Sequence, residues 1–480
     1  QATLDQKLVG VTVDPSDANV TLTANQATGS DVLHLVDANG ARADVPIRVA
    51  FNAGTILPQA TLKVTGTPVD PGWLSQLAGR WVARLTQALP GASTTVTNPA
   101  PPADQLAPGA QTQLAVPVQI SDGGGRYFAQ SGTTTLTVQN VALPPFAPAL
   151  LFYDDDPEHL TQDGVLFRGS VDAAQPAGLY YYHDDGSDPR RLIVALTGNS
   201  QDPTSVELID SSAGPNIDVM QVGHSVSRNF LTIEPHGEGA IVDLAGDDPM
   251  VLHDVPLAAR QGAAGEIDLR VLSGGPVTVT VLAVSPGVDP RSLLNAPVLP
   301  DDGHHRTGVF RIAGFGHDTL DYTAGGEDAK LVIGDRDPTP PSVDPAAPGH
   351  DYGDYGVLHS LDANLRNPGS APVTAYLYFR PIAGIDRASF LVDGNLVELG
   401  CVREPVPYQI SSFELAPGQQ SRATVQTMTD GGSFYPAEIG VTATPPQPSA
   451  PPITAPDGCF PRPAASPAAS PKPSPAPPHR

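Results

Sequence analysis

Apolar and polar residues alternate along most of the chain, which is the pattern of half-buried β-strands. Turn-forming clusters such as DANG and SDGGG separate the alternating runs. Because no helical pattern is interleaved with these runs, the sequence predicts tandem antiparallel β-sandwiches rather than a parallel α/β sheet. Clear examples are LVGVTVDP (8–15), VPIRVAF (45–51), TQLAVPVQI (112–120), PVTVTVLAV (276–284) and VTAYLYF (373–379).

One segment in the N-terminal third has a helical period instead. Asp70 is placed as an N-cap, Pro71 stands at the first helical position, and Pro90-Gly91 forms a stop signal, which together predict a helix over 71–89. The polar side of this amphipathic helix carries little charge, so we expect the helix to pack on neighbouring strands rather than on a membrane surface. The predicted apolar face contains Leu74, Leu77, Trp81, Leu85 and Ala88.

Proline-rich segments mark the predicted domain boundaries. We expect a small immunoglobulin-like β module over 1–55, a β module with the helix over 56–145, a β-sandwich over 146–298 and a second sandwich over 299–444. The remaining residues, 445–480, are rich in Pro, Ala and Ser, and this composition predicts a disordered tail.

Two segments resemble the immunoglobulin- and fibronectin-like sandwich modules of exported bacterial proteins. Residues 7–52 contain VTVDPSDANVTLTA, and residues 355–444 contain LHSLDANLRNPGSAPVTAYLYF and FELAPGQQSRATVQ. The resemblance implies scaffold or adhesion work, and it carries over no catalytic residue.

Composition narrows the compartment and the partners. The 480 residues include 51 Asp and Glu against 26 Lys and Arg, a net charge of −25, and a surface of that sign repels nucleic acid. No apolar run approaches the ~20 residues of a transmembrane helix. Abundant Ala, Gly, Pro and Arg with few lysines suggest a GC-rich bacterial genome, and Gln1-Ala2 resembles an end left by signal cleavage. We therefore expect an exported protein of the bacterial cell envelope, periplasm or exterior, with Cys401 and Cys459 joined in a disulfide.

The segment LPDDGHHRTGVFRI (299–312) raises the question of a metal site. His304 and His305 in a loop could bind zinc or copper with Asp301, and His183 and His224 are candidate distant ligands. Acidic turns such as FYDDDPEHL could likewise hold calcium. The alternative is a polar turn that leads into a core strand, and it is favoured because no metal-binding spacing is present.

A second motif, GHSVS, resembles the nucleophile elbow of α/β-hydrolases around Ser225. Ser227 replaces the second glycine that lets the strand turn sharply. We therefore expect no hydrolase site here.

Aromatic residues beside carboxylates suggest a different site. In the loop HDYGDYG (350–356) we expect Tyr352 and Tyr355 to be exposed and, with Asp351 and Asp354, to contact a ligand, whereas the YYY run at 180–182 is expected in the core. The predicted function is a non-enzymatic scaffold or adhesion protein, without a cofactor, that binds protein or glycan through loops of its sandwiches. The alternative is a metal-binding envelope protein, enzymatic or not, with a His/Asp site in 150–310. The oligomeric state is left open.

Overall fold

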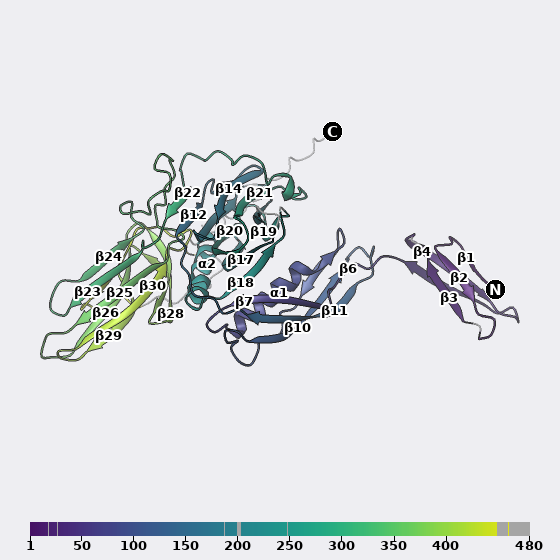
Figure 1. Ribbon diagram of the computed structural model, residues 1–480, viewed down its shortest axis with the longest axis horizontal. Coiled ribbons are helices and arrows are strands. Elements are labelled where there is room, and N and C mark those ends of the chain that lie inside the picture. Colours follow the sequence, from purple (N-terminus) through teal and green to yellow (C-terminus); the bar gives the residue numbers. More distant parts are fainter. Residues whose placement is uncertain are drawn as a thin grey trace, which may run out of the picture. The chain divides into compact units, whose positions relative to one another are not determined.

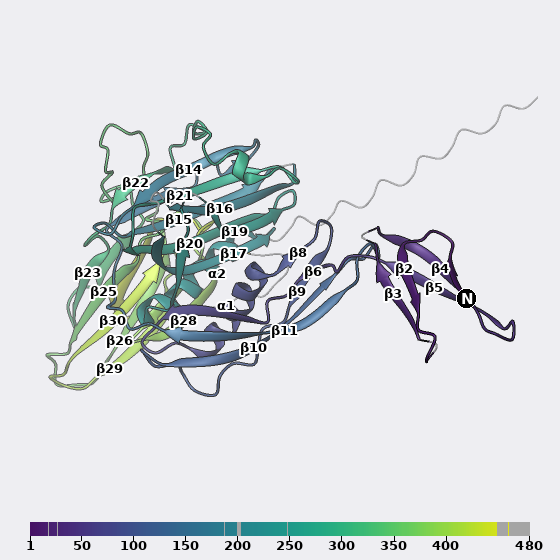
Figure 2. The same cartoon turned by 45° about the vertical axis from the view of Figure 1, so that its right-hand side comes forward.

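A computed structural model describes residues 1–17, 19–25, 27–186, 188–198, 203–246, 248–448 and Cys459. The chain divides into two compact units, residues 1–143 and 144–480, which are treated separately below. The predicted mainly-β class is confirmed (Figures 1 and 2). Within the described ranges, no helix is both long enough and apolar enough to cross a membrane.

Unit 1 begins with a thin β module. Its sheet has the order β1-β4-β5, and the hairpin β2-β3 is paired separately. Among the described residues before Ala50, Val9, Asp31 and Leu33 are the buried side chains. The Asp31 carboxylate accepts hydrogen bonds from the backbone N–H groups of Gln6 and Leu8, which ties the segment before the hairpin to the sheet. The strands are β1 (Ala2–Leu4), β2 (Val9–Val13), β3 (Val20–Ala24), β4 (Gly29–Val36) and β5 (Arg42–Val49).

The rest of unit 1 packs the predicted helix on a sheet of order β9-β10-β11-β7. Helix α1 (Pro71–Leu85) begins as expected, because the Asp70 carboxylate accepts hydrogen bonds from the N–H groups of Gly72 and Trp73. It ends before Ala88, because residues 87–88 form a strand instead, and its most buried face runs through Leu74, Ala78 and Val82. The strands are β6 (Gly54–Thr55), β7 (Gln59–Thr65), β8 (Gln87–Ala88), β9 (Ser93–Val96), β10 (Gln111–Ser121) and β11 (Gln130–Asn140).

Unit 2 contains two β-sandwiches, and the first is built from sheets A and B. In unit 2, sheet A has the order β22-β12-β15-β20-β17-β18, and sheet B has the order β14-β21-β16-β19. Phe152 of sheet A packs on Phe167 of sheet B with ring centroids 5.4 Å apart. The strands of sheet A are β12 (Leu150–Asp154), β15 (Ala177–Asp185), β17 (Thr204–Asn216), β18 (Gly239–Leu244), β20 (Gly262–Ser273) and β22 (Thr307–Arg311). Those of sheet B are β14 (Gly164–Val171), β16 (Arg190–Gly198), β19 (Met250–Leu257) and β21 (Val277–Val284), and β13 (His159–Leu160) pairs with the end of β15. Short 3₁₀ turns are η1 (Glu234–His236) and η2 (Pro290–Ser292).

The second sandwich is built from sheets C and D, with Phe379 and Phe390 packed edge to face in its core, their centroids 5.6 Å apart. Sheet C has the order β23-β25-β30-β27-β28, and sheet D has the order β24-β31-β26-β29. The strands of sheet C are β23 (His317–Thr323), β25 (His359–Arg366), β27 (Ile385–Val392), β28 (Asn395–Arg403) and β30 (Gln420–Met428). Those of sheet D are β24 (Ala329–Ile333), β26 (Val373–Pro381), β29 (Tyr408–Leu415) and β31 (Ala437–Thr442).

Two features differ from the sequence prediction. A second helix, α2 (Val219–Ile233), follows β17 and packs on sheet A, where only strands were expected. In addition, the pairs β7–β11, β12–β15 and β23–β25 are parallel. These parallel pairs arise because the chain leaves the sheet between the two partners, through β14 of sheet B in one case and β24 of sheet D in another.

The predicted disulfide between Cys401 and Cys459 is confirmed. Of the predicted tail, residues 449–458 and 460–480 lie outside the described residues. Residues 445–448 are not disordered: the backbone of Gln447 donates to Pro407 and accepts from Gln409, which extends the pairing of β29.

Candidate functional site

The residues predicted as metal ligands do not gather at one point: His183 lies on β15, His224 lies on α2, and Asp301, His304 and His305 share one turn. His183, on β15, is fully buried, with Nε2 3.2 Å from Asp154 Oδ2 and Nδ1 2.9 Å from the carbonyl oxygen of Pro157. Burial lowers its pKa, but the Asp154 carboxylate outweighs burial and leaves the pKa raised. Within the described residues, no group of three or more His, Cys, Asp or Glu side chains is placed to hold a metal ion.

The segment 299–312 forms the polar turn that was the alternative interpretation. The Asp301 carboxylate accepts from the N–H of Gly303 and lies 2.8 Å from Nδ1 of His305. His304 donates its backbone N–H to Asp302, and its side chain is exposed. The structure therefore brings Asp301 and His305 together, and the chain then enters β22.

The tyrosine loop faces inward except at one residue. Asp351 and Asp354 are buried, and Tyr355 is half-buried, donating its hydroxyl to the carbonyl oxygen of Ser433. Tyr352 is 41% exposed, and the His350 ring is stacked on it with centroids 3.8 Å apart. The expected exposure of Tyr355 is wrong, because Tyr355 stacks on Tyr180 of sheet A. A ligand contact at this loop therefore stays a prediction for Tyr352.

The GHSVS motif lies inside α2 rather than at a strand-to-helix turn. Ser225 Oγ donates to the carbonyl oxygen of Gln221, 2.7 Å away, which is an ordinary contact within one helical turn. The context is therefore strand followed by helix, contrary to the sequence interpretation, but the serine is not on an elbow.

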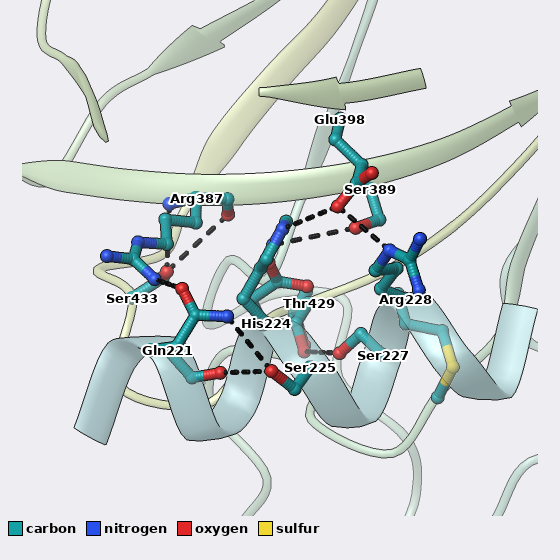
Figure 3. Close-up of polar contacts among 12 residues, drawn as sticks. Gln221, His224, Ser225, Ser227, Arg228, Arg387, Ser389, Glu398, Thr429 and Ser433 are labelled. Carbon is teal, nitrogen blue, oxygen red and sulfur yellow. Dashed lines mark hydrogen bonds and ion pairs between the residues drawn. The ribbon is translucent and has the colours of Figure 1, made fainter. Parts of the chain in front are cut away.

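His224 of the same motif contacts the second sandwich (Figure 3). Its Nδ1 lies 2.6 Å from Asp430 Oδ2, and its Nε2 lies 3.2 Å from Glu398 Oε1. Ser389 Oγ is 3.5 Å from the same Nδ1, which already contacts Asp430. Neither ring nitrogen of His224 is therefore free to act as a general base for Ser389. Burial lowers the pKa of His224, and the two carboxylates more than reverse this, so the pKa is raised and the imidazolium is favoured.

Arg387 forms a second polar contact between the sandwiches. Its guanidinium donates to Asp218, the N-cap of α2, and to Gln221 on the next turn. Arg387 is 1% exposed, and Nε also donates to Cys459 Sγ at 3.1 Å. The buried contacts of His224 and Arg387 hold α2 against sheet C, and their geometry is that of a structural junction.

The outer face of sheet C is divided into a covered part and an open part. Helix α2 covers Ser389 on β27 and Glu398 on β28. The other part, over β23, β25 and β30, which are labelled side by side in Figure 1, is open to solvent. We call its outward side chains the polar face: His317, Thr319, Asp321, Thr323, Ser360, Asp362, Asn364, Arg366, Gln420, Arg422, Thr424 and Gln426.

Strand register arranges the polar face in four rungs of three residues. The rungs are His317–Ser360–Gln426, Thr319–Asp362–Thr424, Asp321–Asn364–Arg422 and Thr323–Arg366–Gln420. Successive rungs are two residues apart, so the four rungs extend about 20 Å along the strands. Every one of these side chains can donate or accept a hydrogen bond.

Two neighbouring grooves follow these rungs, with volumes of about 430 and 530 Å³. Contacts between strands hold several side chains in place: Arg422 donates two hydrogen bonds to Asp362, at 3.1 and 2.6 Å, and Asn364 donates to Asp321 at 2.8 Å. The sequence alone did not reveal this surface. The alternation in HDTLDYT, SLDANLR and QSRATVQ gives the outward positions of each strand, but it does not give which strands are neighbours.

No protein-family model matches the chain, and no curated protein matches its sequence. Among solved structures, the chain is similar to tripeptidyl peptidase 2 at 9% identity and TM-score 0.16, over 93% of this chain and 34% of that one. It is similar to the exported protein XepA of PBSX at 10% identity and TM-score 0.13, over 58% and 86% of the two chains. A third structure contains carbohydrate-binding modules of the β-sandwich superfamily, at 9% identity and TM-score 0.11, over 58% and 84%. The chain thus spans about a third of tripeptidyl peptidase 2, and at these TM-scores none of the likenesses assigns a function.

Proposed function

We propose that this chain is an exported binding protein without catalytic activity that holds a glycan along the polar face of sheet C. The observation that carries the proposal is the pair of grooves lined by regularly spaced side chains with hydrogen-bonding groups. The proposal puts the contact on a sheet face, whereas the sequence favoured the loops.

The chemistry of the polar face matches a hydroxyl-rich polymer. Hydroxyl, amide and carboxylate groups are distributed over the rungs; the hydroxyls and amides can donate to or accept from a sugar hydroxyl, and the carboxylates accept from one. A length of about 20 Å exceeds a single sugar ring, so the natural ligand is a chain of several units. The face presents no Phe, Tyr or Trp ring among its outward residues, so binding relies on hydrogen bonds rather than on stacking.

Preorganisation supports binding as well. Asp362 and Asn364 occupy the middle of the surface and are already held by Arg422 and Asp321. Side chains fixed before the ligand arrives lose less conformational entropy on binding.

Export is supported by the Cys401–Cys459 disulfide, since such bonds persist in oxidising compartments. The buried contacts of His224 join the two sandwiches. The proposal therefore gives this histidine a structural role and no catalytic one. Both ring nitrogens of His224 already contact carboxylates.

The test is a glycan array with the full chain, followed by calorimetric titration of the glycans that bind. The variant Asn364→Ala/Thr424→Ala removes the centre of the polar face and should weaken binding at least tenfold. A matched control is Glu414→Ala, which removes an exposed polar residue from sheet D, where Glu414 accepts from Thr374. Tyr352→Ala tests the loop.

Two outcomes would overturn the proposal. One is the absence of any bound glycan, and the other is binding that Tyr352→Ala abolishes while Asn364→Ala/Thr424→Ala leaves it intact. If Tyr352→Ala and Glu414→Ala still bind the glycan and Asn364→Ala/Thr424→Ala does not, the result supports the polar face as the binding site.

A further inference from the structure

We propose that the ligand of the polar face is a carboxylated glycan, one that contains uronic acids, and that Arg366 selects it. This inference rests on the proposed function and names the substrate class of the same surface.

The two grooves differ in charge. The groove of about 530 Å³ is lined by Arg366, Arg422 and one carboxylate, Asp321. The groove of about 430 Å³ is lined by Asp318 and Asp362 and by no Lys or Arg. The first groove therefore holds both arginines of the polar face, on a chain whose net charge is −25.

The two arginines are in different states. Arg422 is neutralised, because its guanidinium forms a bidentate pair with Asp362. Arg366 is exposed, and in the part of the chain that the structure describes its guanidinium makes no ion pair. Its five N–H donors are therefore available to a ligand.

Register places Arg366 where a ligand in the groove would meet it. Its rung partners are Thr323 and Gln420. Arg422 lies in the adjacent rung on β30, two residues from Gln420. Both guanidiniums thus border one groove, between neutral side chains that can hold the ring hydroxyls.

A guanidinium binds a carboxylate through two parallel hydrogen bonds, and this pairing is stronger than a hydrogen bond to a neutral hydroxyl. A uronate would place its carboxylate on Arg366 and its hydroxyls on Gln420, Thr323 and Asn364. A neutral sugar would use only the second set of contacts. Selection for acidic sugars follows from this difference.

The experiment compares three probes by calorimetric titration with the full chain: an oligogalacturonate, its fully methyl-esterified form and a dextran sulfate. The methyl ester keeps the shape and the hydroxyls of the uronate but removes its charge. Wild type should bind the oligogalacturonate about tenfold more tightly than the ester, the scale of one charge-assisted hydrogen bond. Arg366→Gln should abolish the difference and leave binding of the ester unchanged. Arg311→Gln, a substitution of an exposed arginine on β22, is the matched control and should behave as wild type.

The outcomes separate the inference from the proposed function. Equal binding of acid and ester, or dextran sulfate binding as tightly as oligogalacturonate, overturns the carboxylate assignment while glycan binding stands. A preference for the acid that survives Arg366→Gln overturns the role of Arg366. Failure of all three probes, together with an empty glycan array, overturns the proposed function itself.

Discussion

Gly223 of α2 and Gly431 of the loop between β30 and β31 meet backbone to backbone. A Cβ atom on Gly223 would overlap the carbonyl oxygen of Gly431 and lie 2.5 Å from its Cα. Gly431 in turn faces sheet A, where a Cβ on it would lie 2.5 Å from the Tyr180 hydroxyl. Helix α2, sheet A and this loop of the second sandwich therefore pack together without room for an additional methyl group.

Gly223→Ala tests this close packing. The new methyl group would push α2 away from Gly431, and we expect the free energy of unfolding to fall by about 1–3 kcal/mol, the usual cost of overpacking. Gly186→Ala is the control, since a Cβ there meets nothing within 4 Å. Denaturant unfolding of both variants measures the effect, and equal midpoints would refute the close packing.

His224 should make the stability of unit 2 depend on pH. Its folded pKa is raised above the ordinary value of 6.5 by Asp430 and Glu398, although burial opposes them. A histidine with a raised folded pKa contributes fully below its unfolded pKa, and the contribution is lost as pH rises through the folded pKa. The melting temperature should therefore fall from about pH 6.5 upward.

His224→Gln should remove the part of that slope that His224 contributes and leave the rest of the pH dependence in place. It should also lower the free energy of unfolding at pH 6 by about 3–5 kcal/mol, because Asp430 would be left buried without a cation. Melting curves between pH 5.5 and 9 measure both effects. A slope as steep in the variant as in the wild type would assign the whole titration to other groups.

Much of the fold follows from local patterns in the sequence, but α2 does not. Alternation identified strands such as Val277–Val284, and the cap at Asp70 identified α1. In α2, Val219, Val222, Val226 and Phe230 do recur at helical spacing, yet Val, Ser and Gly are weak helix formers. Tertiary packing between two sheets stabilises this helix, and the local sequence does not encode that packing.

The junction and the polar face illustrate the same limit. His224 contacts Asp430, 206 residues away along the chain, so no spacing rule could pair them. For the polar face, alternation in each strand shows which side chains point outward. It does not show that β23, β25 and β30 are neighbours, because β23 and β25 form a parallel pair only after the chain has left the sheet between them. Local patterns gave the side chains of the candidate site but not their convergence.

Asp386 is expected to destabilise the protein at neutral pH. Burial raises its pKa to about 8, against a hydrogen bond from the backbone of Phe434 that lowers it. An acid with a raised folded pKa ionises first in the unfolded chain, so stability is lost as pH rises from about 4 to 8. Asp386→Asn should remove this penalty.

The expected gain for Asp386→Asn at pH 7 is at least about 1.4 kcal/mol in the free energy of unfolding, the equivalent of one pKa unit. At pH 4 the variant and wild type should differ little. Urea titrations at the two pH values provide the measurement. A variant that is less stable at pH 7 would mean that the carboxylate is ionised and stabilising in the folded protein.

The disulfide should stabilise the junction between α2 and sheet C. Cys459 is 4% exposed and packs with Met220 of α2 and Ile385 of β27, while Arg387 donates to its sulfur. The bond spans 58 residues, and closing a loop of that length contributes about 4 kcal/mol in the chain-entropy model. Cys401→Ser/Cys459→Ser should therefore lower the denaturant midpoint of unit 2, and dithiothreitol should lower the midpoint of the wild type to that of the variant.

Because the chain-entropy model attributes the effect to the unfolded chain, the polar face should still bind glycan in the folded variant under native conditions. An unchanged midpoint in the variant would show that the bond does not constrain unfolding, and a loss of glycan binding would show that it shapes the folded state instead.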